Sequence, residues 1–175
     1  MNEELLRKIR TVPDFPKKGI MFRDITTLIR DNRAFRKTID LLAERYKHAG
    51  IDKVVSVESR GFIFGAPLAY VLHAGFVPIR KPGKLPAAVT RQEYSLEYGT
   101  DVIEMHTDAI DPGEKVLLLD DLLATGGTIR AACDLVQRSG GEIVGLAFLV
   151  ELSFLHGRDR LKEYDVYSIL QYDQE

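Results

Sequence analysis

The sequence predicts an α/β protein built on a central, mostly parallel sheet that is flanked by helices. Short apolar strands, such as 53–57 and 115–119, alternate along the chain with helical segments such as 62–72 and 128–139. Strands separated by helices form βαβ units, whose strands run parallel. The segment 115–119 is apolar at every residue but the first, as a strand buried on both faces is. The 175 residues fit a single domain, 1–175, with its own hydrophobic core.

The first 50 residues predict two helices joined by an extended segment. Asn2 is a suitable cap for a short helix, because Glu3 and Glu4 after it favour the positive helix end. Pro13 and Pro16 then predict an extended connector up to Gly19. A longer amphipathic helix is expected over about 31–48, with Gly50 after its end.

The remainder of the chain predicts alternating strands and helices around one long loop. Residues 81–94 contain Pro82, Gly83 and Pro86, which favour a loop. The other expected elements are strands at 53–57, 76–80, 100–106, 115–119, 143–149 and 166–170, helices at about 62–72 and 128–139, and a turn at 111–114.

Composition excludes several classes of protein. A single cysteine, Cys133, rules out a disulfide framework and a cysteine-based zinc cluster, and we expect it to pack in the core. The formal net charge of -2 argues against a nucleic acid as partner. No apolar run is long enough for a membrane helix, and the first residues do not form a signal peptide. We therefore expect a soluble cytoplasmic protein without a membrane partner.

The segment 116–128 is the most informative part of the sequence. An apolar strand ends in Asp120 and Asp121, and a loop of small residues follows and opens a helix: Ala124, Thr125, Gly126, Gly127 and Thr128. Backbone amides, hydroxyls and the helix dipole suit a phosphate there, although the lysine of a Walker loop is missing. Because carboxylates repel phosphate, the two aspartates are expected to face sugar hydroxyls, a metal or a developing cation.

The chain resembles the type I phosphoribosyltransferases, and among them the members that use adenine. The resemblance includes the loop above together with Phe-Arg-Asp-Ile at 22–25, Glu-Ser-Arg-Gly-Phe at 58–62, and the segments 80–86 and 95–99. These segments occur in the family's order and span nearly the whole chain. Some members have a basic residue where Pro82 stands, which weakens any role for that position alone.

The resemblance implies transfer of ribose 5-phosphate from phosphoribosyl pyrophosphate to N9 of adenine, giving AMP and pyrophosphate. It also implies the family fold, with residues 1–30 as a base-binding hood and 81–99 as a flexible catalytic loop, a bound Mg²⁺ carried by the substrate, and a homodimer. Glu97 takes the position of a general acid/base near N7 of the base, while Asp120 and Asp121 hold the ribose and favour its positive charge. The residues implied for the 5′-phosphate are Ala124, Thr125, Gly126, Gly127 and Thr128; those for pyrophosphate are Ser59, Arg60, Arg80, Lys81 and Lys84; those for the base are Met21, Phe22, Arg23 and Leu152.

Simpler interpretations stay open beside these assignments. The basic residues between 80 and 91, Arg91 included, form a local patch that could be solvated, and the apolar base-binding candidates could belong to the core. The alternatives for function are transfer to another purine base, such as a 6-oxopurine, and a non-catalytic regulator of the same fold. A regulator would need a DNA-binding extension or a basic face, neither of which this sequence contains.

Overall fold

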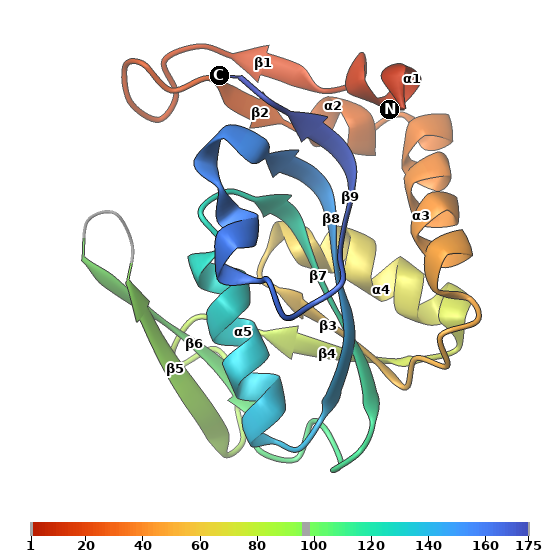
Figure 1. The fold of residues 1–175 in the computed structure, drawn as a ribbon, viewed down its shortest axis with the longest axis vertical. Coiled ribbons are helices and arrows are strands. Elements are labelled where there is room, and N and C mark those ends of the chain that lie inside the picture. The colour runs from red at the N-terminus through yellow and green to blue at the C-terminus, as the bar shows by residue number, and fades with distance from the viewer. Residues whose placement is uncertain (1, 96–98, 175) are drawn as a thin grey trace.

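The computed structural model describes residues 2–95 and 99–174, and it confirms the α/β class (Figure 1). At its centre is a five-stranded sheet in the order β4-β3-β7-β8-β9, in which every neighbouring pair is parallel. The strands are β3 (Lys53–Val57), β4 (Gly75–Ile79), β7 (Lys115–Leu123), β8 (Glu142–Leu152) and β9 (Val166–Tyr172).

Helices cover both faces of this sheet, which explains its continuous apolar strands. Helices α3 (Asn32–Tyr46) and α4 (Arg60–Leu72) lie on one face, and α5 (Gly127–Arg138) lies on the other (Figure 1). Along β7, Leu117 and Leu119 belong to the core cluster under α3 and α4, whereas Val116 and Leu118 belong to the cluster under α5. Successive side chains of a strand point to opposite faces, so both clusters exclude water from β7.

The N-terminal segment contains two strands and a short helix, α2, that the sequence did not predict. The short helix α1 (Glu3–Leu6) is followed by two three-residue strands, β1 (Arg10–Val12) and β2 (Phe22–Asp24), which pair antiparallel, and by helix α2 (Thr26–Ile29). The expected short helix is confirmed as α1. The connector expected up to Gly19 lies between the two strands, but it consists of turns and bends and is not extended. A strand of three residues is too short to show a periodic pattern of apolar side chains. Such strands form because they pair with each other, and that pairing cannot be seen in the local sequence.

The predicted loop at 81–94 is also wrong in its second half. Strand β5 (Val89–Ser95) pairs antiparallel with β6 (Thr100–His106), so the connection from β4 to β5 spans only residues 80–88. The hairpin projects from the side of the molecule next to α5 (Figure 1). Two 3-10 turns, η1 (Ser153–Leu155) and η2 (Gly157–Arg160), follow β8.

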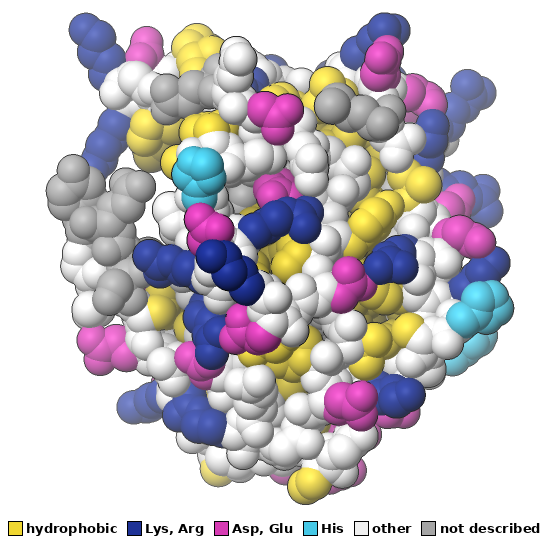
Figure 2. All heavy atoms as spheres, in the orientation of Figure 1, with side chains coloured by type: hydrophobic (Ala, Val, Ile, Leu, Met, Phe, Trp, Pro, Cys, Tyr) yellow, Lys and Arg dark blue, Asp and Glu magenta, His cyan; other side chains and the backbone are white. Residues whose placement is uncertain are grey.

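Charged side chains of both signs are intermixed on the face shown in Figure 2. None of the helices formed by residues 2–95 and 99–174 combines the length and the apolar character needed to cross a bilayer.

Candidate active site

Two adjoining pockets lie at the carboxyl ends of β3 and β7, which are neighbours in the sheet. The larger, about 360 Å³, is lined by Glu58, Ser59, Arg60, Lys81, Tyr94, Asp120, Asp121 and Thr128, together with Val57. The smaller, about 80 Å³, is lined by the loop from Ala124 to Thr128 and by Asp120. Asp120 and Thr128 line both pockets, so a ligand can extend from one into the other. Ligands of open parallel sheets bind at this edge.

The small pocket has the features of a phosphate site. Gly126 adopts φ +79° immediately before α5, a conformation that favours glycine, and α5 begins at Gly127 beside the pocket. The positive end of a twelve-residue helix therefore lies at a loop of small residues. The sequence prediction of a strand, a small-residue loop and a helix agrees with the structure here, although β7 continues to Leu123 and includes both aspartates.

The loop rests on η2 with no space between the two backbones. A Cβ on Gly126 would stand 2.6 Å from the carbonyl oxygen of Gly157, and a Cβ on Gly157 would stand 2.2 Å from the carbonyl oxygen of Ala124. Arg158, the next residue, donates two hydrogen bonds of 2.7 Å to the buried carboxylate of Glu151 in β8. The sequence offered no signal for this support, because 157–160 and 124–126 meet only in the folded chain.

Asp120 and Asp121 meet Arg60 at the boundary of the larger pocket. Arg60 Nε lies 2.9 Å from Asp121 Oδ2, and the Asp121 side chain is only 7% exposed. Burial, followed by the adjacent Asp121 charge, raises the pKa of Asp120 well above its usual value. Burial also raises the pKa of Asp121, although Arg60 opposes that shift. A cation bound at this pair would therefore favour the state in which both carboxyl groups are ionised.

Glu58, to which the sequence gave no role, joins the basic residues of the neighbouring segment. Its carboxylate accepts hydrogen bonds from Arg80 Nε at 2.8 Å, from the Lys81 backbone amide at 2.9 Å and from Lys84 Nζ at 2.9 Å. Burial opposes ionisation, but these three donors together lower the pKa of Glu58 from 4.5 to about 2. The sequence does show an acidic residue beside Ser59 and Arg60. Its role could not be predicted, because the residues it contacts lie more than 20 positions away in the chain.

The segment after β4 is fastened to the β5–β6 hairpin as well. Lys81 Nζ pairs with Asp101 and lies 3.4 Å from the Tyr94 hydroxyl. The amide of Gly83 donates to Glu104 at 3.0 Å, and Arg91 Nε lies 2.6 Å from the same carboxylate. The structure therefore brings Arg80, Lys81 and Lys84 to the larger pocket or to Glu58 in its lining, whereas Arg91, a residue of β5, pairs with Glu104 within the hairpin.

The residues that the sequence assigned to the base are only partly brought together. The Arg60 guanidinium lies 5.6 Å from the centre of the Phe22 ring, which places Phe22 next to the acidic pair. Phe22 also lines an apolar cavity of about 350 Å³ with Val12, Phe15 and Asp24. The guanidinium of Arg23 instead stacks on the Tyr172 ring, 4.2 Å from its centre, and donates to Thr11.

The remaining base candidates have no contact with this cavity among the described residues. Met21 is exposed, and Leu152, the last residue of β8, packs partly buried against the core under α3 and α4. Glu97 lies outside the described residues.

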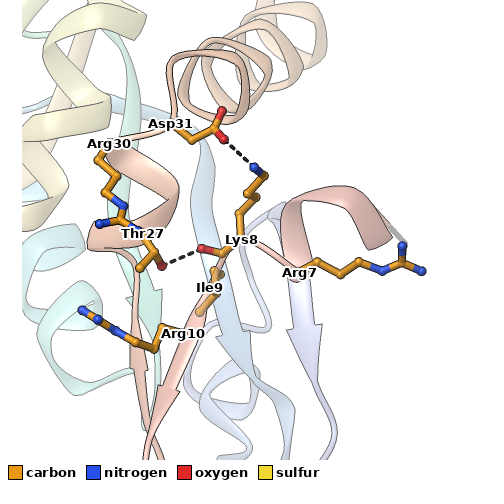
Figure 3. A pocket seen from close by; sticks show the side chains of 7 residues that line it. All are labelled: Arg7, Lys8, Ile9, Arg10, Thr27, Arg30 and Asp31. Carbon is orange, nitrogen blue, oxygen red and sulfur yellow. Dashed lines mark hydrogen bonds and ion pairs between the residues drawn. The ribbon is translucent and has the colours of Figure 1, made fainter.

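A further basic cavity, of about 300 Å³, is found between α1 and α2 (Figure 3). Three of its four cations have acidic partners: Lys8 pairs with Asp31, Arg10 Nε donates to Asp24 at 3.0 Å, and Arg7 lies 3.5 Å from Glu3. Its lining includes none of the residues that line the two pockets above.

Comparison with known proteins agrees with this geometry. A family model described as "Phosphoribosyl transferase domain" matches residues 26–174. The chain is 59% identical to an adenine phosphoribosyltransferase of Chloroflexus aurantiacus, over 97% of this chain and 98% of the relative. The structure is similar to the crystal structure of adenine phosphoribosyltransferase from Thermoanaerobacter pseudethanolicus, with a TM-score of 0.94 and 52% identity over 97% and 99% of the two chains. It is also similar to the yeast enzyme from Saccharomyces cerevisiae complexed with an imino-altritol bisphosphate and adenine, with a TM-score of 0.90 and 40% identity over 95% and 96% of the chains.

Proposed function

This chain belongs to the phosphoribosyltransferase family, and we propose that it transfers ribose 5-phosphate from phosphoribosyl pyrophosphate to N9 of adenine. The products are AMP and pyrophosphate, and the reaction serves purine salvage. The observation that carries this proposal is one continuous site containing a phosphate loop, an acidic pair and Arg60, in a chain that matches adenine-specific relatives over nearly its full length.

The shared border of the two pockets suits the ribose phosphate. With the 5′-phosphate at Ala124–Thr128, the ribose would lie beside Asp120 and Asp121, which line the larger pocket. Breaking the bond from C1 to pyrophosphate builds positive charge on the ribose. Carboxylates held in a poorly hydrated site stabilise that charge more strongly than solvated ones do. The two aspartates therefore hold the hydroxyls and favour the oxocarbenium-like transition state.

The leaving pyrophosphate would contact the basic residues of the larger pocket. Ser59, Arg60 and Lys81 line that pocket, and Arg80 and Lys84 adjoin it through Glu58. Arginine and lysine donate to phosphate oxygens and offset the charge that develops on the leaving group.

The residues present fit a magnesium ion that arrives with the donor. Among residues 2–95 and 99–174 no group of three or more His, Cys, Asp or Glu side chains is placed to hold a metal. Mg²⁺ keeps several waters and takes one or two carboxylates together with substrate oxygens, and Asp120 and Asp121 supply that number. When bound, the ion would offset charge on the pyrophosphate as it leaves.

The adenine ring would lie by Phe22, whose position next to Arg60 connects the apolar cavity to the acidic pair. Met21, the backbone near Arg23 and Leu152 complete the proposed base contacts. Glu97 is proposed as the general acid/base at N7, on the basis of its position in the sequence motif.

We also propose that the enzyme is a cytoplasmic homodimer. The exposed apolar side chains Ile63, Tyr70 and Val71 on α4 support a contact between two copies, close to Arg60 at the start of the same helix. The single cysteine fits a reducing compartment.

Purified protein incubated with Mg²⁺, phosphoribosyl pyrophosphate and one base at a time tests the reaction. AMP should form from adenine and should account for the pyrophosphate released. If nucleotide formed from hypoxanthine and not from adenine, the proposed base would be wrong. If no base gave a nucleotide, the proposed transferase activity would be refuted. Asp121→Asn and Glu97→Gln should each reduce turnover, and full activity of Glu97→Gln would refute the acid/base role.

A further inference from the structure

We propose that Glu58 is a positioning residue for the donor: its carboxylate holds Arg80, Lys84 and the backbone at Lys81 in place to receive pyrophosphate. This inference rests on the proposed function, because it assigns those cations to the pyrophosphate end of the donor. The carboxylate itself need not touch the reacting atoms.

The buried carboxylate of Glu58 lies between two long, partly exposed cationic side chains, those of Arg80 and Lys84. The Glu58 side chain is 7% exposed, whereas those of Arg80 and Lys84 are 35% and 51% exposed. Glu58 follows β3, while both cations follow β4, so the contacts fasten the ends of two neighbouring strands together. Within the described part of the chain, Glu58 is the only acidic group that pairs with Lys84.

The contacts leave donors available for a ligand. Arg80 uses Nε for Glu58 and one terminal nitrogen for the carbonyl of Lys84, at 3.3 Å, out of five N–H groups. Lys84 uses one of its three N–H groups for Glu58. A pyrophosphate can therefore be bound by side chains that are already ordered, and it need not displace the carboxylate.

Charge favours the same conclusion. Arg80 and Lys84 together carry two positive charges and Glu58 one negative charge, so the cluster remains cationic and still attracts pyrophosphate. Without Glu58, two exposed cations would repel each other and would lose rotamer freedom only when the donor binds. A ligand that must order its own binding groups binds more weakly than one that meets them in position.

The direct test is Glu58→Gln, which keeps the shape and an acceptor for the Lys81 amide but removes the charge. We expect the KM for phosphoribosyl pyrophosphate to rise about five- to tenfold, with the KM for adenine changed less than twofold. In the reverse reaction the KM for pyrophosphate should rise by the same factor. An unchanged or lower KM for the donor would overturn the proposal, since a lower value would make Glu58 a competitor of the ligand.

A matched control is available at the other end of the sheet. Glu114 lies 3.4 Å from Lys53 Nζ and accepts from the backbone amide of Asp111 at 2.9 Å, so it also joins a lysine and an amide. Glu114→Gln should leave both KM values unchanged. A similar rise in the control, or an equal rise for adenine, would mean general damage to the fold and would refute positioning.

A double-mutant cycle and a spectroscopic signal separate positioning from other roles. In the Glu58→Gln background, Lys84→Met should raise the donor KM less than it does alone, because the ordering of Lys84 is already lost. The Nε–H NMR signal of Arg80 should be protected from exchange in the ligand-free parent protein and lost in Glu58→Gln. Independent effects in the cycle, or a signal that survives, would overturn the proposal.

Two further measurements keep the test decisive. If Glu58→Gln fails to fold, Glu58→Asp keeps the charge but shortens the reach, and it should raise the donor KM as well; an unchanged KM there would refute positioning. If the parent protein forms no AMP, the proposed function fails. Calorimetric binding of magnesium pyrophosphate to parent and variant then still decides whether Glu58 orders the anion site, and equal affinities would refute it.

Discussion

Replacing Gly157 with alanine should selectively impair binding of the donor's 5′-phosphate. The added Cβ would stand 2.2 Å from the carbonyl oxygen of Ala124 and 3.0 Å from Leu123 Cδ1, whereas ordinary contacts begin at 3.4 Å. Relief at the carbonyl requires a separation of about 1 Å between η2 and the loop, because both groups there are backbone. A displacement of about 1 Å in a group that positions substrate costs up to about 100-fold in rate.

Initial rates with varied phosphoribosyl pyrophosphate measure this effect. We expect kcat/KM for the donor to fall between about 10- and 100-fold, and a free energy of unfolding lower by about 1–3 kcal/mol, as for other overpacked sites. Gly75→Ala is a suitable control, because its one tight Cβ contact would be with the flexible side chain of Lys53, at 3.0 Å, and the residue lies at the start of β4. A Gly157→Ala enzyme with the parent's donor KM would refute the view that η2 supports the phosphate loop.

Other predictions follow from the buried groups. Asp120→Asn should lower kcat at least about tenfold and yet raise the melting temperature, because it removes a partly buried charge beside the buried Asp121; a lower melting temperature would contradict this. Because Glu58 has its pKa lowered from 4.5 to about 2, its contribution to stability is complete above about pH 5 and is lost as the pH falls toward 2. Urea unfolding across that range should show a weaker pH dependence for Glu58→Gln, and equal slopes would count against the ion pairs. Burial raises the pKa of the Cys133 thiol to about 12, so a thiol reagent at pH 8 should modify it only after unfolding.

The sequence predicted the central sheet well because its strands are buried on both faces. Strands β3 and β6 have the predicted bounds, and β7 was recognised from a run of apolar residues that only a covered strand tolerates. The pair β1 and β2 and the strand β5 were missed for one physical reason. Each is defined by a partner strand rather than by its own burial pattern, and β5 in particular has a polar sequence over most of its length.

The same distinction, between local and distant contacts, separates the site residues that could be predicted from those that could not. Residues that are contiguous in the chain, as in the phosphate loop and the acidic pair, could be predicted because a strand, a loop and a helix fix their positions. Glu58 and Gly157 could not, since their roles depend on contacts with segments 22 and 33 residues away. Glu97 depends on the family motif and stays a prediction.

The ion pairs also explain how a chain with a net charge of -2 can hold a highly charged anion. The cations assigned to pyrophosphate each meet a carboxylate from another element: Arg60 meets Asp121, Arg80 and Lys84 meet Glu58, and Lys81 meets Asp101. These partners reduce the repulsion among cations gathered around one ligand-free pocket and fix their directions. Three of the acidic residues that contribute to the negative total, Glu58, Asp101 and Asp121, are therefore part of the anion site. Removing one of them raises the local positive charge and should nevertheless weaken donor binding, because the order of the cations is lost with it.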